Sequence, residues 1–211
     1  QASVKKQIAA LGSNRLMIQP QAQHTAGVRQ QRGAVSRLTV DEATHIDGRI
    51  ATVTGVTGMV QGRVQVVFGD KNANTLLQGT MPGYQIVYSA PTSFGRFYTM
   101  EECETRARVV VLGATVVGEL FGVQNPVGQW IQINHIPFLV IGVLEQKGAS
   151  GGGDADDVAL VPLQTAMYRV LGKEYVDWID VSAASPAVVD ETADEVLDPT
   201  RGWPPIPNVD G

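Results

Sequence analysis

Residues 107–148 constrain the fold most, because local signals for a strand, a helix and a hairpin follow one another there without a break. Arg108–Leu112 is a short β-branched run that is typical of a strand buried on both faces, and Gly113 ends it. Ala114–Phe121 changes to a helical period of apolar residues, and Gly122 stands where a helix commonly ends. The stretch therefore predicts a strand followed by a helix.

A β-hairpin should complete this stretch. Trp130–Ile133 and Ile136–Leu144 are rich in strand formers, and Asn134-His135 between them favours the positive φ angles of a type I′ turn. Pro137 lacks an amide hydrogen, yet it falls at a position where the ladder requires no bond from it. The expected register pairs Ile133 with Ile136 and Ile131 with Phe138.

Composition limits the class of protein. The chain has 211 residues, 44% of them hydrophobic, which is enough for one large domain or two small ones. A net charge of -5 and the absence of a basic stripe argue against nucleic acid as a partner. No window holds 18 or more uncharged apolar residues, so we expect a soluble domain cut from a longer protein.

No residues stand out as catalytic, cofactor-binding or metal-binding. His24, His45 and His135 lack the paired spacing that a zinc site needs, and no nucleophile elbow or nucleotide loop is present. Cys103 lies among Glu101, Glu102 and Glu104, whose carboxylates would raise the thiol pKa. We therefore predict no metal, no cofactor and no enzyme activity, and we interpret Cys103 as a surface or half-buried structural residue.

The segment Gly148–Asp157 has three consecutive glycines, three aspartates and no large apolar residue, so we predict a flexible loop. It lacks the Lys-Ser/Thr of a phosphate loop. A calcium loop that started at Asp154 would also lack the required Gly and Glu. Weak cation binding by the aspartates stays open as a minor alternative.

The first half of the chain should contain short elements. Ser3–Leu11 has helical spacing, Asn14–Gln19 alternates like a strand, and Gln21–Arg37 is a polar stretch that we interpret as a long mobile loop. Thr39 should cap a helix over Val40–Ile46.

The middle of the chain should form a twisted sheet. Arg49–Val60 and Val64–Phe68 are β-branched, Gln61-Gly62 could close a tight hairpin between them, and Asp70–Asn74 could form another turn before a short strand over Thr75–Leu77.

The remaining predicted elements are a helix over Met100–Arg106 capped by Thr99, a strand over Val158–Leu163, a helix over Thr165–Leu171 ended by Gly172, a strand over Val176–Ser182, and a last helix with Ser185 as N-cap and its buried stripe over Val188–Leu197.

Several motifs together resemble one known family. They are LGATVVGELFG, NPVGQWIQIN and PFLVIGVLEQKG, with Gly12-Ser13-Asn14, Gly95–Thr99 and Ala159–Leu163 in the same order. This pattern is similar to the extracytoplasmic core domain of MacB-type, FtsX-like ABC transporter permeases. Each motif is weak alone, but their joint order and spacing cover Ser3–Val196, nearly the whole chain.

The strand and helix order predicts an α+β fold, a mixed sheet with helices on one face built from βαβ-type lobes. The resemblance implies a porter-like core from residues 1–47 and 84–198, with a small inserted α/β subdomain at 48–83. We interpret the Pro-rich residues 199–211 as a disordered tail or a cloning remnant, because the sequence departs from the family there.

The resemblance also implies a function: a non-catalytic domain that couples cytoplasmic ATP hydrolysis to export of drugs, peptides or lipoproteins. It would lie on the periplasmic or extracellular face of a bacterial cytoplasmic membrane. The implied partners are an ABC ATPase, a membrane-fusion adaptor and a second copy in a homodimer. A stand-alone extracytoplasmic module that binds a ligand or a protein remains the alternative.

Overall fold

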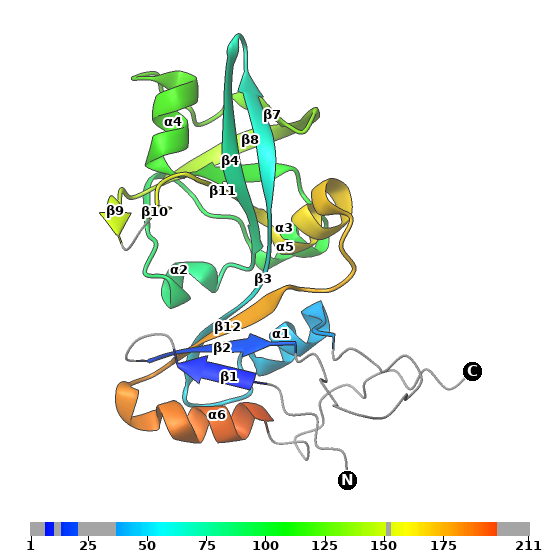
Figure 1. The fold of residues 1–211 in the computed structure, drawn as a ribbon, viewed down its shortest axis with the longest axis vertical. Coiled ribbons are helices and arrows are strands. Elements are labelled where there is room, and N and C mark those ends of the chain that lie inside the picture. Colours follow the sequence, from blue (N-terminus) through cyan, green and yellow to red (C-terminus); the bar gives the residue numbers. More distant parts are fainter. Residues whose placement is uncertain (1–6, 11–13, 21–36, 151–152, 198–211) are drawn as a thin grey trace, which may run out of the picture.

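The computed structural model describes residues 7–10, 14–20, 37–150 and 153–197 (Figure 1). Its strands are β1 Gln7–Ala10, β2 Arg15–Gln19, β3 Val53–Phe68, β4 Lys71–Thr80, β5 Thr92–Gly95, β6 Val109–Leu112, β7 Trp130–Ile133, β8 Ile136–Leu144, β9 Ala149–Ser150, β10 Gly153–Asp154, β11 Val158–Pro162 and β12 Trp178–Ala183. Its helices are α1 Val40–Ile46, α2 Tyr84–Val87, α3 Met100–Glu104, α4 Ala114–Phe121, α5 Leu163–Thr165, a π-helix over Ala166–Leu171, a 3₁₀ turn over Pro186–Val188 and α6 Val189–Leu197.

In the described part of the chain, one mixed sheet runs in the order β1-β2-β12-β3-β4-β11-β6-β8-β5. Strand β7 pairs with both β3 and β8, so the pairing closes a ring through β3, β4, β11, β6, β8 and β7. This ring and its helices form the upper body in Figure 1, while β1, β2 and β12 with α1 and α6 form a smaller lower layer. The predicted α+β class, a mixed sheet with helices, is confirmed.

Strand β3 corrects the predicted hairpin at Gln61-Gly62. It continues through Gly62, which pairs with Leu77 of β4, and a Cβ on Gly62 would come within 2.7 Å of the Leu171 side chain. The glycine is present for close packing and does not mark a turn. The chain reverses at Gly69-Asp70 instead, where Gly69 has a φ of +58°. The turn predicted over Asp70–Asn74 is therefore mostly strand β4.

The hairpin of β7 and β8 is confirmed in register and turn. Ile133 pairs with Ile136 and Ile131 with Phe138. Asn134 and His135 have φ angles of +46° and +69°, as a type I′ turn requires. The predicted strand and helix before it also form, as β6 and α4, and α4 ends at Gly122 with a φ of +60°.

The predicted N-terminal helix is wrong where the structure describes it. Gln7–Ala10 is a strand, β1, that pairs antiparallel with β2, while the rest of Ser3–Leu11 lies outside the described residues. A helix of nine residues is marginal in isolation, and ladder pairing with β2 supplies the backbone bonds that a short amphipathic pattern cannot guarantee. Strand β2 itself is confirmed, with Leu16 and Ile18 buried. The predicted loop over 21–37 and the tail over 199–211 fall outside the described ranges, except for Arg37.

The starts of α1 and α3 were predicted correctly because capping is local, whereas Ser185 makes no side-chain cap bond and is followed by the 3₁₀ turn before α6. The Glu42 backbone N–H donates to Thr39 Oγ1 at 3.2 Å at the start of α1. Thr99 and Glu102 form a reciprocal capping box at α3. The helix predicted over Thr165–Leu171 begins earlier, as α5 at Leu163, and continues as a π-helix that ends at Gly172 with a φ of +62°. A turn wider than an α-helix could not be inferred from periodicity.

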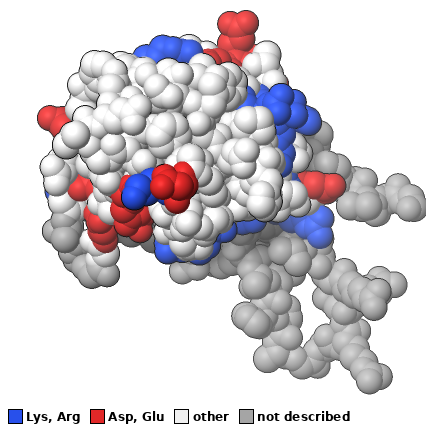
Figure 2. Space-filling view, turned by 90° about the horizontal axis from the view of Figure 1, so that it is seen from above, with Lys and Arg blue, Asp and Glu red and all other residues white. Residues whose placement is uncertain are grey.

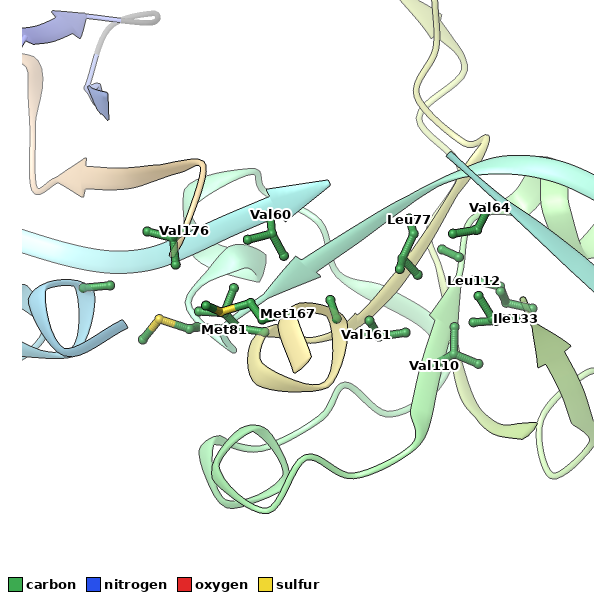
Figure 3. Packing of buried hydrophobic residues seen from close by; sticks show 14 of the residues in the cluster. Val60, Val64, Leu77, Met81, Val110, Leu112, Ile133, Val161, Met167 and Val176 are labelled. Carbon is green, nitrogen blue, oxygen red and sulfur yellow. The ribbon is translucent and has the colours of Figure 1, made fainter. Parts of the chain in front are cut away.

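The main core fills the ring. Figure 3 shows Leu77 of β4, Val110 and Leu112 of β6, and Ile133 of β7 gathered toward one another, and all four are fully buried. Residues 48–83 supply β3 and β4 to this same sheet. The division into a 1–47 and 84–198 core and a 48–83 insertion stays a prediction, because ladder pairing alone does not define a folding unit.

Two glycine substitutions should have opposite effects on stability. A Cβ on Gly79 would meet Ala166 Cβ at 2.4 Å and Val60 Cγ2 at 2.7 Å, so Gly79→Ala should lower the free energy of unfolding by about 1–3 kcal/mol. Gly118 lies in α4 with nothing within 4 Å of its Cβ position, so Gly118→Ala should raise it by about 0.5–1 kcal/mol. Urea denaturation of both variants measures the difference, and equal effects would contradict this packing.

Candidate functional site

The residues considered for metal or catalytic chemistry do not come together. Among the described residues, no group of three or more His, Cys, Asp or Glu side chains could hold a metal ion. His45 lies on α1 and His135 in the β7–β8 turn, while His24 falls outside the described ranges. Within the same part of the chain, no helix has the length and apolar character needed to cross a membrane.

The most unusual polar chemistry lies where α2 packs on β3 and β12. Side chains alternate along a strand, and Ile179 and Val181 of β12 belong to the main core with Leu16 and Ile18. Asp180 therefore points to the other side, toward α2, and it is fully buried. A buried carboxylate among β-branched residues needs hydrogen-bond partners.

Asp180 receives two hydrogen bonds on one oxygen. Tyr88, which follows α2 directly, donates its O–H to Asp180 Oδ2, and Trp178 Nε1–H donates to the same atom at 2.8 Å. Among the described residues, Asp180 Oδ1 and Arg15 Nε are buried without a hydrogen-bond partner. Burial raises the pKa of Asp180, while the two hydrogen bonds and the nearby Arg15 charge act in the opposite direction.

Arg15 and Lys147 complete this junction. The Arg15 guanidinium lies over the Tyr88 ring at 4.6 Å from its centroid, and Lys147 Nζ donates to the Tyr88 carbonyl oxygen. Burial, followed by the charge of Asp180, raises the pKa of Tyr88 well above its ordinary value, so its O–H remains a donor. The cluster therefore joins β2, β12, α2 and the segment after β8.

A row of aromatic rings continues from this junction into the upper body. Tyr88 stacks on Tyr84 at 4.5 Å, Tyr84 faces Phe97 at 6.3 Å, and Phe97 meets Tyr98 at 4.2 Å between ring centroids. Tyr98 is fully buried and hydrogen-bonds through its hydroxyl to Thr80 Oγ1 at the end of β4. Burial raises the pKa of Tyr84 to about 12. The rings form a continuous packed path between the two bodies.

The Gly95–Thr99 motif holds this row in place. A Cβ on Gly95 would lie 2.2 Å from the Ile141 carbonyl oxygen, and its φ is +72°, so only glycine fits this approach. Arg96 then pairs with Glu102 at 2.6 Å and 3.2 Å, while the Thr99 backbone N–H also donates to Glu102. The Arg96 hydrogen bond is the main reason that the pKa of Glu102 is lowered.

The far end of the upper body carries a hollow. The β3–β4 turn and the end of α4 line a cavity of about 440 Å³, beside which the Phe68 and Phe121 rings meet at 4.2 Å. Val123 next to it is fully exposed. Figure 2 looks onto this end, where most of the surface is uncharged, and the lining of the hollow includes Asp70, Lys71 and Glu119. An exposed end that combines apolar surface with a few charged groups suits protein contact.

The predicted flexible loop over Gly148–Asp157 forms two short paired strands where the structure describes it, and residues 151–152 lie outside the described ranges. Ala149–Ser150 and Gly153–Asp154 pair as β9 and β10, and each aspartate has a partner. Thr115 donates to Asp154, the Lys147 and Gly148 backbone N–H groups both donate to Asp156, and Thr75 donates to Asp157. The aspartates fasten the segment to α4 and β4. Composition suggested mobility because it does not reveal these distant donors.

Cys103 is also more deeply placed than predicted. Its side chain is fully buried between α3 and the end of β4, and its Sγ–H lies 3.7 Å from the Thr80 carbonyl oxygen. The thiol pKa is raised to about 11, as the sequence suggested. The main cause is burial, and the charges of Glu102 and Glu104 add less.

Sequence reasoning missed the junction cluster. Arg15 and Asp180 are 165 residues apart in the sequence, and the pairing of β2 with β12 brings them together. Tyr88 joins them from the end of α2. One local signal was available: Asp180 is the charged residue of the strand Trp178–Ala183, whose other residues are apolar except for Ser182. Such a residue requires a buried partner.

Asp180→Asn and Glu102→Gln should change the pH dependence of stability in opposite directions. The folded chain retains the Asp180 proton to a higher pH than the unfolded chain, so ionisation of Asp180 lowers stability as the pH rises above about 4. The stabilisation from Glu102 is complete above its unfolded pKa and is lost as the pH falls through its lowered folded pKa.

The measurement is urea unfolding between about pH 3 and pH 7, with each variant compared with the parent chain. Relative to the parent chain, Asp180→Asn should gain stability as the pH rises, and Glu102→Gln should lose stability. Parallel curves for the two variants would contradict the assigned shifts.

Cys103 should resist thiol reagents while the chain is folded. A pKa of about 11 leaves about one thiolate in a thousand at pH 8, and the sulfur is not exposed. Labelling with a maleimide should therefore follow urea unfolding. Stoichiometric labelling of the native chain within minutes would show that α3 opens readily.

The chain is similar in sequence to parts of several longer transport proteins. It is 40% identical over 194 residues to the macrolide export ATP-binding/permease protein MacB of Bdellovibrio bacteriovorus, covering 92% of this chain and 30% of that protein. It is 41% identical over 184 residues to the protein of the same name from Chlorobaculum tepidum, covering 87% of this chain and 28% of the relative. The chain thus spans less than a third of the length of these relatives.

Solved structures agree in fold. The periplasmic region of MacB from Actinobacillus actinomycetemcomitans superposes with a TM-score of 0.69 at 23% identity, covering 88% of this chain and 83% of that one. The extracellular domain of the noncanonic ABC-type transporter YknZ from Gram-positive bacteria gives a TM-score of 0.64 at 19% identity, covering 76% and 80%. The family model of the MacB-like periplasmic core domain matches residues 1–198. The chain therefore belongs to the MacB-like periplasmic core domain family, whose members are periplasmic domains of ABC transporter permeases.

Proposed function

We propose that this domain is non-catalytic and couples ATP hydrolysis on the cytoplasmic side to export, by transmitting a conformational change from its lower layer to its upper body. The observation that carries this proposal is the junction of Arg15, Tyr88 and Asp180, which ties the two bodies together through buried polar contacts. Coupling requires an element that can adopt two arrangements, each with a different affinity for a partner.

Strand β3 gives the domain a stiff axis. Its sixteen residues span about 50 Å at the usual rise per residue, from the lower layer to the far end. Its first half pairs with β12 and its second half with β4. A displacement of the lower layer would therefore move the distal end as a lever, provided that the ring stays closed.

The distal end is the surface that we assign to a membrane-fusion adaptor. Val123, the β3–β4 turn and the cavity between them lie at the end opposite β1 and α6. Most of the surface around them is uncharged, but Asp70, Lys71 and Glu119 line the cavity, so contact would combine apolar burial with a few charged groups. In the intact permease the further partners would be an ABC ATPase domain or subunit and a second copy of the permease.

The exported substrate is proposed only as a class. The relatives are named for macrolide export, and drugs, peptides and lipoproteins are the cargo classes that this kind of permease suggests. The alternative, a stand-alone binding module, is favoured by one observation. The cavity of about 440 Å³ falls within the size range of small-molecule sites.

Site-specific photo-cross-linking in the full-length permease tests the distal contact. A photoreactive phenylalanine analogue replaces Val123 at the far end or, as the control, Asp190 on α6. With the adaptor co-expressed, position 123 should cross-link to it and position 190 should not. Equal cross-linking at both sites, or none at position 123, would remove the distal surface from the proposal. Retention of a macrolide by the isolated domain would favour the binding-module alternative.

A further inference from the structure

We propose that α2, with Tyr88, is a latch between the lower layer and the upper body, and that Arg15 changes partner when the latch opens. In the closed arrangement, Arg15 lies on the Tyr88 ring and Tyr88 bonds Asp180. In the released arrangement, Arg15 pairs directly with the Asp180 carboxylate. The role of this latch in transport rests on the proposed function, but the latch itself can be tested on the isolated chain.

The closed arrangement depends on a small number of contacts. Tyr88 donates to Asp180 Oδ2, its ring carries the Arg15 guanidinium at 4.6 Å, and Lys147 holds its carbonyl oxygen. Helix α2 has only four residues, of which Tyr84 and Val87 are buried and Ile86 is 56% exposed. Short elements with few contacts open locally before the whole chain unfolds.

The positions of two opposite charges argue for the released arrangement. Strand register places Arg15 opposite Ser182 and Met17 opposite Asp180, so Arg15 and Asp180 are diagonal neighbours on one face. Diagonal neighbours are about 7–8 Å apart, which an arginine side chain can span. Among the described residues, Arg15 Nε and Asp180 Oδ1 both lack a hydrogen-bond partner while buried. Pairing them would satisfy both groups once Tyr88 has left.

The backbone around α2 also favours movement as a unit. Ser89, just after Tyr88, has a φ of +49°, an uncommon conformation for a residue other than glycine. At the other end, a Cβ on Gly83 would lie 2.1 Å from the Val56 carbonyl oxygen, so the chain passes close to β3 there. A close pivot at one end and a strained residue at the other suit a short element that swings away.

Opening this latch would break the aromatic row between Tyr84 and Phe97. Tyr88 would leave the lower layer together with Tyr84, which stacks on it at 4.5 Å, while Phe97 and Tyr98 stay on the upper body. The two bodies would then remain joined by β3, by β12 and by the main core, which contains side chains from both. Opening the latch would therefore remove one of the paths by which a movement of β2 reaches the upper body.

Hydrogen exchange on the isolated chain tests the opening. Tyr88→Phe removes the hydroxyl donor and keeps the ring, so the α2 amides should exchange about tenfold faster while the β3–β4 amides stay unchanged. Tyr168→Phe is the matched control, because Arg106 lies over that ring at 4.2 Å on the surface, and it should leave α2 unchanged. If α2 exchanges only together with β3–β4 in the Tyr88 variant, there is no latch.

A double-mutant cycle tests the change of partner. Arg15→Gln and Asp180→Asn are combined in the parent chain and again in a Tyr88→Leu background, which removes both the ring and the hydroxyl. The coupling between Arg15 and Asp180, measured from urea unfolding, should be at least fivefold larger in the Tyr88→Leu background. The same cycle in Tyr168→Leu is the control. Equal coupling in all backgrounds would overturn the partner exchange.

A disulfide lock separates the latch from the proposed function. A Cβ on Gly55 lies 3.1 Å from Ile86 Cβ, a few tenths of an ångström short of disulfide spacing, so Gly55→Cys with Ile86→Cys should fasten α2 to β3. In the isolated chain, oxidation should slow exchange of the α2 amides, and reduction should restore it. If the lock forms and their exchange is unchanged, the latch is refuted.

The same lock in the full-length permease tests the role of the latch in transport. Transport that stops on oxidation and returns on reduction supports the latch as part of the coupling. If the isolated chain has shown opening and transport nevertheless persists with α2 locked, the role of the latch in transmission is overturned. The latch itself is then still supported by the measurements on the isolated chain. The single variant Ile86→Cys is the control for oxidation.

Discussion

The structure depends on strand β3 taking part in two sets of contacts at once. Its first half is paired with β12 in the lower layer, and its second half closes the ring with β4 and β7. Neither body can be completed without it. The closeness of Gly58 and Gly62 to Leu163 and Leu171 explains why such a long strand carries glycines, since side chains from the α5 and π-helix segment pack directly on its backbone.

Local chemistry determined what the sequence could predict. Turn residues and caps act within a few positions, so the hairpin at Asn134-His135 and the capped start of α3 were predicted in detail. The turn at Gln61-Gly62 was wrong because a glycine that accommodates Leu171 looks the same in sequence as a glycine that reverses the chain. Strand β1 was missed because its ladder partner, and not its own pattern, decides its conformation.

The candidate site was predicted least well, because it consists of contacts across the two bodies. Asp180 could be singled out as the charged residue of a mainly apolar strand, but the sequence around Tyr88 and Arg15 gives no sign of their role. The same holds for the aspartates of Gly148–Asp157, whose donors lie on α4, on β4 and just before β9. Family resemblance predicted the fold and the class of protein, whereas the positions of these charged side chains could be found only from the three-dimensional structure.

The parallel pairing of β4 with β11 has a consequence for how the chain folds. These strands are separated by more than seventy residues, and β11 is also the bridge from β4 to β6. While the chain is being synthesised, the β3–β4 hairpin can form early, but the free edge of β4 stays unpaired until residues 158–162 have been synthesised. Such non-local closure makes folding slow and exposes an edge to wrong partners, so ring closure is the step most sensitive to a delay in synthesis.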